Sequence, residues 1–331
     1  MINKLRFYKF SRFFPILLIL MVPLTESSTA QSTVALIHSA NSEISNQEDP
    51  YRSEFFRVDH NPTININTLS GDIEVVQNSA IEGVQIDLYV KREFSLWSGT
   101  RNLDNYRIII QKQGNSIIAS VEDRRSNRSA DDVKFNFSIQ VPKEASLNLR
   151  SINGKIDADN VEGQHYVQNL AGNLNIRNMT GEIRAISTAG DIMLDNLKGN
   201  IYAKTVSGDI TADRDYGEIR LRTTTGDIVT SGISGTLVAA STSGDIQSDF
   251  QEVSIGVYLE TTTGDIDLTL PKMAGYDIDA RGLSFNFDEL GDAGITKRVG
   301  FGNASVEIRE GGIPVNLKTV AGSIKVRESQ Q

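Results

Sequence analysis

The sequence predicts an all-β fold of the β-solenoid class, with two short strands in each 18-residue coil and irregular capping regions at both ends. The first observation is a glycine at every ninth position, in a register kept by eleven glycines from Gly154 to Gly244. The second is an apolar residue two and four positions after most of these glycines. The third is an alternation of two kinds of corner. A nine-residue unit cannot bury its own apolar face, so the units must stack.

Each unit contains one short strand. Ile or Leu stands two positions after the glycine in ten of the eleven units, and only His165 departs from this rule. An apolar residue stands four positions after the glycine in nine units. Apolar residues two apart, with polar residues between them, are typical of a strand with one buried face.

The corners between strands show that the true period is two units rather than one. Before every second glycine comes a corner rich in Ser and Thr, such as Thr223-Thr224-Thr225, and an aspartate follows the glycine. The intervening corners differ, as in Asn160-Val161-Glu162. Stacked coils would place equivalent residues about 4.8 Å apart. We therefore expect one buried column of isoleucines, formed by Ile192, Ile210, Ile228 and Ile246.

Residues 1–30 are predicted to be a signal peptide, and residues 31–52 a flexible leader. Four basic residues precede an apolar run from Phe13 to Leu24, and Ser28-Thr29-Ala30 supplies the small residues of a cleavage site. The apolar run is shorter than the ~20 residues of a membrane-spanning helix. We expect export to the periplasm or to the cell surface or extracellular space, with no integral membrane span after signal removal.

The rest of the chain divides into three regions. Residues 53–150 hold an isolated repeat copy, Thr68 to Ile73, and are predicted to be an irregular N-terminal β region that caps the solenoid; a separate sandwich domain is the alternative. Residues 151–270 form the regular solenoid, with a two-residue slip of the register after Gly244. Residues 271–331 form the C-terminal coils and cap. Within them, residues 275–313 look loop-like and a last repeat copy runs from Thr319 to Val326.

Composition disfavours several classes of function. The formal net charge of −9 argues against binding to nucleic acid and to anionic membranes. The absence of cysteine rules out thiol catalysis and cysteine metal sites. No nucleophile elbow, zinc-protease motif or phosphate-binding loop occurs, so we predict no catalytic residue and no cofactor. His165 stands without a partner nucleophile and is interpreted as a core or edge residue.

A polysaccharide-active enzyme of the parallel β-helix type is the main alternative. Such a site needs clustered carboxylates, and Asp157 with Asp159, or Asp213 with Asp215, stand two positions apart. In a strand, this spacing places both side chains on the same side. In an acidic chain, the pattern fits polar residues of an outer face better.

A calcium-binding β-roll is a further alternative, because it shares the nine-residue period. This chain lacks the Gly-Gly-x-Gly-x-Asp pattern of those rolls. A ladder of like charges nevertheless requires compensation. We expect hydrogen bonds from Ser and Thr hydroxyls and from corner amides, rather than calcium. The ladder consists of Asp191, Asp209, Asp227, Asp245 and Asp265.

Outward positions differ between the two halves of each coil. In the half that follows the aspartate they are mainly acidic, as in Asp195 and Asp213. In the other half they are basic and aromatic: Tyr166, Arg184, Tyr202, Lys204, Arg220 and Arg222. Two tyrosines and two arginines of this set should alternate in one ladder with cation–π contacts. Because Tyr and Arg are common at interfaces, these six residues are predicted to bind a partner, either an envelope protein or an acidic glycan. A purely structural role is the alternative, and self-association is left open.

The recurring Ser/Thr-x-Ser/Thr-Gly-Asp-Ile unit, with Val141-Pro142 ahead of Leu147 to Ile156, resembles a known family. It is a bacterial family of β-strand-repeat proteins of unknown function that are provisionally described as adhesins, and it is similar to the toastrack domains of envelope-stress proteins. The resemblance covers Phe55 to Val326. It implies a solenoid-like fold outside the cytoplasm and brings no catalytic residues. We therefore expect an exported, non-catalytic module that acts in interactions of the cell envelope or surface, as adhesins do.

Overall fold

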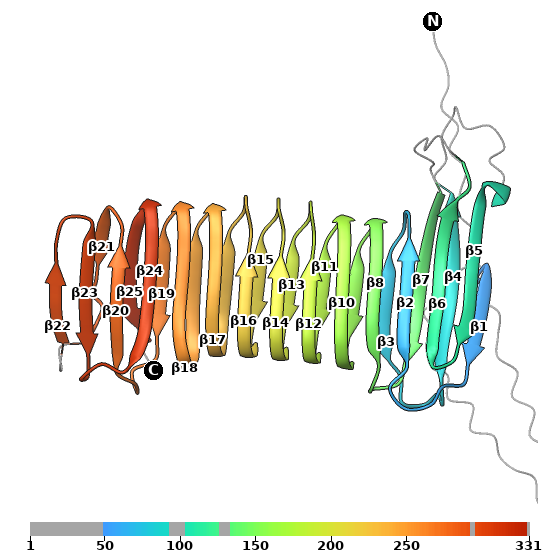
Figure 1. Cartoon of the computed structure of the whole chain (residues 1–331), viewed down its shortest axis with the longest axis horizontal. Helices are drawn as coiled ribbons and strands as arrows, with labels where there is room; N and C mark the ends of the chain where they lie inside the picture. Colours follow the sequence, from blue (N-terminus) through green and yellow to red (C-terminus); the bar gives the residue numbers. More distant parts are fainter. Residues whose placement is uncertain (1–48, 93–102, 126–132, 292–294, 330–331) are drawn as a thin grey trace, which may run out of the picture. The chain divides into compact units, whose positions relative to one another are not determined.

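The computed structural model describes residues 49–92, 103–125, 133–291 and 295–329 (Figure 1). The predicted signal peptide, most of the predicted leader and residues 93–102, which include Trp97, lie outside the described residues. The described residues form one compact unit. In its described part, this unit is all β except for one 3₁₀ turn, η1 (Leu103–Asn105). The predicted fold class is confirmed.

Regular coils form the middle of the unit, and each coil contributes one strand to each of two facing sheets. Sheet A holds the strands that follow the aspartate corners, and sheet B holds the strands that follow the asparagine corners. Neighbours within a sheet are parallel and one full coil apart in the chain, as in the pairing of Ile192 with Ile210. The regular strands of sheet A are β9 (Ile156–Asp159), β11 (Leu174–Arg177), β13 (Ile192–Asp195) and β15 (Ile210–Asp213). Those of sheet B are β8 (Ser146–Asn153), β10 (Glu162–Ala171), β12 (Thr180–Ile186), β14 (Lys198–Lys204) and β16 (Tyr216–Arg222).

Two long strands, β17 (Ile228–Ser243) and β18 (Ile246–Thr263), each run from sheet A into sheet B, and β19 (Ile266–Leu270) continues sheet A. Between β17 and β18 the pairing changes, because Gly235 lies opposite Val253 whereas Leu237 lies opposite Val257. The predicted two-residue slip is therefore present, and the extra residues form a bulge in β18.

At the N-terminal end, the isolated repeat copy takes its place in the stack. Ile64 of β2 (Thr63–Thr68) pairs with Leu147, which is distant in the sequence, and β3 (Ile73–Gln77) pairs with β9 in the same parallel sense. The outer sides of β2 and β3 are covered by β6 (Ser116–Asp123) and β7 (Val133–Val141). Antiparallel pairs of β1 with β4, β4 with β7 and β5 with β6 complete this end, where β1 is Arg52–Phe56, β4 is Val84–Arg92 and β5 is Tyr106–Gln113. Strand pairing therefore continues without a break from residue 52 into the regular coils.

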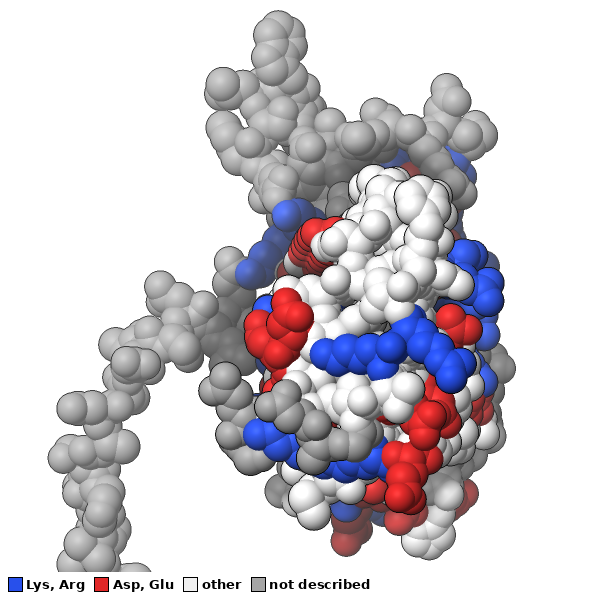
Figure 2. All heavy atoms as spheres, turned by 90° about the vertical axis from the view of Figure 1, so that its left-hand side faces the viewer, with Lys and Arg blue, Asp and Glu red and all other residues white. Residues whose placement is uncertain are grey.

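The C-terminal end is built in the same way. β24 (Ile313–Ala321) inserts between β18 and β20 (Tyr276–Arg281), and β25 (Ser323–Glu328) inserts between β19 and β21 (Ser284–Asn286). β23 (Asn303–Ile308) pairs with β20, and β22 (Ile295–Val299) pairs with β23 at the end of sheet B. Figure 2 views this end and shows side chains of both charges on it. Charges on an edge strand disfavour pairing with another chain.

One sequence-based expectation about these ends was wrong. Residues 275–313 are not loop-like, because they contain β20 to β23. In this region β20 and β23 alternate buried and exposed residues, but no copy of the Gly-Asp-Ile unit occurs there, so the repeat motif did not reveal them. At the other end, β1 begins at Arg52, the last residue of the predicted leader, so the two boundaries differ by a single residue.

The predicted core column is confirmed, because Ile192, Ile210 and their equivalents in the next coils are fully buried. Glycine recurs because successive coils touch at their corners. A Cβ on Gly208 would lie 2.3 Å from the backbone oxygen of Gly190, and Gly208 has a φ of +147°. No amino acid other than glycine can adopt this conformation and also allow so close an approach between the two backbones. The nine-residue period is therefore a steric requirement of stacking.

Candidate functional site

The six predicted partner-binding residues lie together on the outer surface of sheet B. Tyr166 on β10 is beside Arg184 on β12, which is beside Tyr202 on β14, which in turn is beside Arg220 on β16. Two residues further along the strands, Lys204 lies beside Arg222. The two tyrosines are half-buried, and the four cationic residues are exposed. We call this set, with Arg150 added below, the Tyr–Arg stripe.

The contacts within the stripe are less regular than predicted. The Arg184 guanidinium lies over the Tyr202 ring, 4.8 Å from its centroid, as expected of a cation–π ladder. Arg220 instead forms an ion pair with Glu218, on its own strand. The partner of the Tyr166 ring is Arg150, at 5.3 Å, which belongs to the neighbouring column. The ladder is therefore interrupted, and one of its cations is neutralised.

Sequence reasoning missed Arg150 and Tyr258. Arg150 stands on β8 beside Gln168, in the column that later contains Lys204. Carrying the repeat one coil upstream of Gly154 would have placed it there. Tyr258 lies beside Val238, but the two-residue bulge in β18 shifts it out of the strict period and so hid it.

Four cations of the stripe lack a carboxylate partner. Within the described residues, none of them forms an ion pair. Glu182 stands two residues before Arg184 on the same strand, and even these two form no ion pair. The chain has 42 acidic and 33 basic residues, so the lack of pairs does not follow from a shortage of acids. The four cations are Arg150, Arg184, Lys204 and Arg222.

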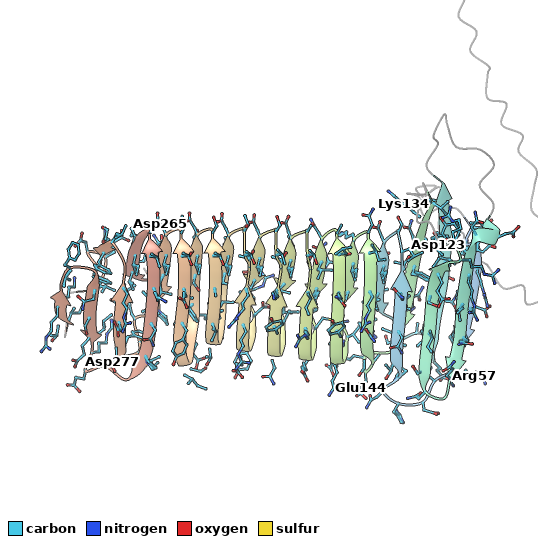
Figure 3. All side chains as sticks on the ribbon, turned by 45° about the horizontal axis from the view of Figure 1, so that its top comes forward. Arg57, Asp123, Lys134, Glu144, Asp265 and Asp277 are labelled. Atoms are coloured by element: carbon cyan, nitrogen blue, oxygen red, sulfur yellow. The ribbon has the colours of Figure 1, made fainter. Side chains whose placement is uncertain are left out.

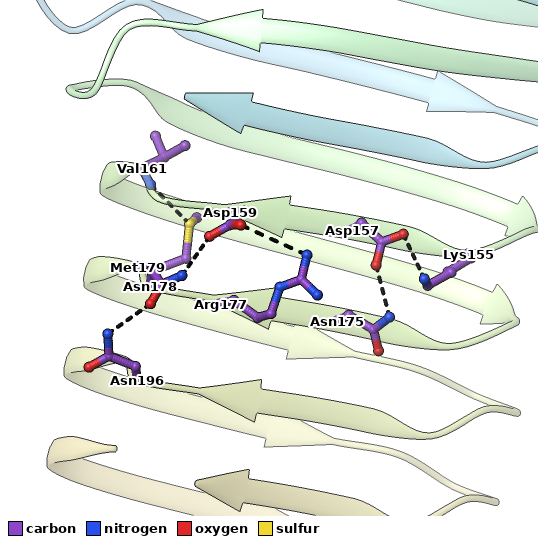
Figure 4. Close-up of polar contacts among 9 residues, drawn as sticks. All are labelled: Lys155, Asp157, Asp159, Val161, Asn175, Arg177, Asn178, Met179 and Asn196. Carbon is purple, nitrogen blue, oxygen red and sulfur yellow. Dashed lines mark hydrogen bonds and ion pairs between the residues drawn. The ribbon is translucent and has the colours of Figure 1, made fainter. Parts of the chain in front are cut away.

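The outer surface of sheet A shows the opposite arrangement (Figure 4). Arg177, the basic residue of its regular strands, and two basic corner residues, Lys155 and Arg214, each have a carboxylate beside them. The pairs are Lys155–Asp157 at 2.9 Å, Arg177–Asp159 at 3.8 Å and Arg214–Asp213 at 3.0 Å, with Asp195 as a second partner of Arg214. Asparagine amides bind the remaining oxygens, because Asn175 donates to Asp157 and Asn178 to Asp159, each at 2.8 Å. Sheet A therefore satisfies its own charges.

The aspartate ladder is compensated by backbone amides. The N–H of Asp209 donates to Oδ1 of Asp191 at 3.0 Å, and the same bond recurs in the following coils up to Ser323, whose N–H donates to Asp265. Figure 3 labels Asp265 on this edge of the stack. The corner hydroxyls bond elsewhere, since Thr205 donates to the backbone oxygen of Gly190. The expectation of amide donors was right, and that of hydroxyl donors was wrong.

No metal is required by this arrangement. Within the part of the chain that the structure describes, no group of three or more His, Asp or Glu is placed to hold a metal ion. That the ladder binds no calcium tightly stays a prediction, which calorimetry would check.

Asp215 corrects an interpretation made from the sequence. It is fully buried, not on an outer face, and it does not lie on the same side as Asp213. The alternation of a strand ends before it, because Arg214 adopts a left-handed conformation with φ 54° and turns the chain inward. It therefore occupies a corner column whose other members are Val161, Met179, Leu197 and Ile233.

The buried Asp215 carboxyl group is incompletely paired. Its Oδ1 accepts the N–H of Leu197 at 2.7 Å, while its Oδ2 has no partner within the described residues. Burial raises the pKa of Asp215 to about 7, and the nearby carboxylates of Asp195 and Asp213 act in the same direction. The group is therefore uncharged over much of the acidic range.

His165 is the core residue that the sequence suggested. It is 3% exposed, and its ring nitrogens form no hydrogen bond within the described residues. Burial lowers the pKa of His165 to about 4, although nearby backbone groups of Thr180 and Val161 oppose part of this shift. The imidazole is neutral near pH 7.

The comparisons with known proteins agree with this architecture. The chain belongs to the family described as Toastrack DUF4097, whose sequence profile matches residues 57–217 and again residues 215–327. The resemblance inferred from the sequence is thereby confirmed. No curated protein sequence matches the chain.

Two crystal structures are similar to parts of this chain. One is a candidate cell adhesion protein from Clostridium sporogenes ATCC 15579, with 12% identity and a TM-score of 0.25. The match covers 84% of this chain and 99% of that protein's chain. The other is a candidate adhesin from Bacteroides fragilis NCTC 9343, with 14% identity and a TM-score of 0.40. The match covers 83% of this chain and 96% of that protein's chain. Among the residues that the structure describes, no helix is long and apolar enough to cross a membrane.

Proposed function

We propose that the protein is an exported, non-catalytic interaction module of the cell envelope or cell surface, and that it binds its partner through the Tyr–Arg stripe. The observation that carries this proposal is the row of four cations on sheet B that have no carboxylate partner among the residues that the structure describes. Adhesin-like action is also what the names of the two similar crystal structures suggest for those proteins.

The unpaired cations favour an anionic partner. An arginine without a carboxylate is free to form two parallel hydrogen bonds with one. Tyr166 and Tyr202 lie between these cations and supply rigid, half-exposed contact area at a low cost in conformational entropy. In a chain of net charge −9, such a surface is a local exception to the field of the whole molecule. An acidic glycan or an acidic envelope protein would meet these requirements.

The described titratable side chains whose pKa values are displaced by burial do not form an accessible catalytic site. Active sites are built around titratable groups whose pKa values are displaced within an accessible cleft. In the described residues, burial displaces the pKa values of Asp215 and His165, and both side chains are buried. Neither side chain is more than 3% exposed, so a polysaccharide-cleaving mechanism would have to rely on other carboxylates, on the outer surface.

Export is part of the proposal and rests on residues 1–30. The basic head, the apolar run and the small residues at Ser28-Thr29-Ala30 support it. Cell fractionation followed by determination of the N-terminus checks this part. A protein that starts near Gln31 in the periplasm or culture medium is expected, and a full-length protein in the cytoplasm would contradict it.

The binding surface is tested by co-sedimentation with isolated cell envelopes. The triple variant Arg184→Ser, Arg220→Ser and Arg222→Ser should remain folded and lose at least tenfold in binding. The matched control removes three cations from sheet A, as Lys155→Ser, Arg177→Ser and Arg214→Ser, and should bind like the wild type. Equal binding by both triple variants would contradict the proposed surface. Release of soluble sugar from an acidic polysaccharide by the purified protein would favour the enzyme alternative.

A further inference from the structure

Sheet B carries a groove beyond the C-terminal end of the Tyr–Arg stripe. Its volume is about 320 Å³, and its lining residues come from five successive strands: β16, β17, β18, β24 and β20. Five strands span four strand spacings, or ~19 Å. The groove therefore runs along the row of coils, across the strands, and suits an extended ligand better than a compact one.

Small side chains open the groove at its N-terminal end. Column positions that carry Arg220 and Arg222 on β16 are taken by Val238 and Ala240 on β17. On the next strand, β18, Tyr258 and Glu260 follow at the same positions. The small side chains of β17 lie between larger ones on β16 and β18. They leave a hollow on the outer surface over Ala239, whose own side chain is buried. The shape of the groove follows directly from these residue sizes.

Charges along the groove are mostly balanced. Lys318 and Glu260 form an ion pair at 2.6 Å, and Arg281 and Asp279 lie 3.9 Å apart. Arg222, where the groove meets the stripe, has no carboxylate partner in the described residues. The groove thus offers donors and acceptors in similar numbers along most of its length and one free cation at its end.

This pattern selects among anionic polymers. A dense polyanion, such as an acidic peptide, would place carboxylates against Glu260 and Asp279, and like charges repel. A polymer with widely spaced carboxylates would place hydroxyls against the paired charges and Asn316, and one carboxylate against Arg222. Tyr258, which is 39% exposed, offers an amphipathic ring beside such a chain.

We propose that this groove binds a linear polysaccharide in which uronic acid residues alternate with neutral sugars, with a uronate carboxylate on Arg222. The same chain then continues over the free cations Lys204 and Arg184. This inference rests on the proposed function and names the class of its ligand.

Titration calorimetry with a hyaluronan hexasaccharide, which carries one carboxylate in every second sugar, tests the proposal. Ala240→Phe fills the groove and should reduce affinity at least tenfold. The control Thr211→Phe adds the same ring to an exposed position of sheet A and should leave affinity unchanged. Arg222→Gln should reduce affinity at least fivefold for the hexasaccharide and not for its carboxyl-reduced form, whereas Arg214→Gln should affect neither.

Three outcomes would overturn the proposal: no binding of the hexasaccharide by the wild type, unchanged binding by Ala240→Phe, or equally tight binding of poly-L-glutamate. If any of them occurs while the triple variant of sheet B still fails to bind envelopes, the stripe remains the binding surface and only the glycan assignment is wrong. If that triple variant binds envelopes normally, the proposed function itself fails.

Discussion

The two outer surfaces of the solenoid are built from the same repeat and differ in how they treat charge. On the regular strands of sheet A and their corners, the basic residues Lys155, Arg177 and Arg214 all lie against carboxylates. On sheet B, four cations face solvent or an aromatic ring without a carboxylate in the described part of the chain. Both surfaces cover one core and share one stacking geometry, so folding does not require this difference.

The two surfaces carry two kinds of side-chain ladder, one that is hydrogen-bonded within itself and one whose donors are available to a partner. Asparagine and aspartate ladders on sheet A close on themselves through hydrogen bonds, such as the 2.8 Å bond from Asn196 to Asn178. The Tyr–Arg stripe leaves donors open. A surface with unsatisfied cations gains most from an external anion, which is the reason to assign binding to sheet B.

The largest loss of stability is expected for a core residue that lies beneath both outer surfaces. Ile210→Asp places a carboxylate in the fully buried column between Ile192 and Ile228. A buried, unpaired charge costs several kcal/mol, so the free energy of unfolding should fall by more than about 4 kcal/mol. Thermal unfolding measures it. The control Thr211→Asp, on the exposed side of the same strand, should change stability by less than about 0.5 kcal/mol. An unchanged melting temperature of Ile210→Asp would contradict the two-strand coil.

A slightly smaller change in stability is expected at Asp215, on the corner that follows strand β15 of sheet A. The pKa of Asp215 is about 7 in the folded protein, against an ordinary value of 3.8, so the charged form penalises folding. The contribution of Asp215 to wild-type stability should be full below about pH 4, decline as pH rises to about 7, and then stay constant. Asp215→Asn removes this penalty and keeps an oxygen for the Leu197 N–H. Its gain should approach roughly 4 kcal/mol at pH 8 and vanish near pH 4.

Chemical denaturation at several pH values measures this difference. Asp213→Asn serves as the control, because Asp213 is half-exposed and paired with Arg214. A gain for Asp215→Asn that is the same at pH 4 and pH 8 would show that packing, not ionisation, is responsible.

The buried histidine of sheet B should respond to pH with the opposite sign. The pKa of His165 is about 4 when folded, against an ordinary value of 6.5, so protonation penalises folding. Its contribution is present above pH 6.5 and is lost as pH falls toward about 4. His165→Leu should therefore gain up to roughly 3 kcal/mol over the wild type as pH falls through this range. The double variant with Asp215→Asn should show both gains added, since the sites are several coils apart. A gain for His165→Leu that does not depend on pH would contradict the assignment.

The ion pairs of sheet A should give the smallest effect. Exposed pairs contribute about 0.2–1 kcal/mol each, so Lys155→Ser, Arg177→Ser and Arg214→Ser together should cost about 1–3 kcal/mol at low salt and less in 1 M NaCl. Arg184→Ser, Lys204→Ser and Arg222→Ser on sheet B should cost at most about 1 kcal/mol, independent of salt, because no ion pair is lost and only the cation–π contact of Arg184 with Tyr202 is removed. Equal, salt-sensitive losses in both triple variants would contradict the contrast between the surfaces.

The regular coils could be predicted from the sequence because a steric rule repeats there. Glycine is the only residue that fits where Gly208 meets Gly190, so the period is visible without any other information. The six residues of the stripe followed from that period. Arg150 and Tyr258 lay just outside its strict register and were missed.

The ends and the buried Asp215 could not be predicted in this way. Ile73 and Ile324 join the stack out of chain order, and a local pattern carries no information about such insertions. Asp215 points inward because Arg214 turns the corner, whereas the alternation rule assumed a continuing strand. In both cases the missing information was where the chain changes direction.

The most direct test of the central claim is oxidative footprinting of the protein with and without isolated envelopes. Tyr202 and Tyr258 report on sheet B, and Met193, which is 49% exposed, reports on sheet A. If sheet B is the binding surface, the envelopes should protect both tyrosines from oxidation and leave Met193 as reactive as in the free protein. Protection of Met193 with unchanged tyrosines would contradict the account.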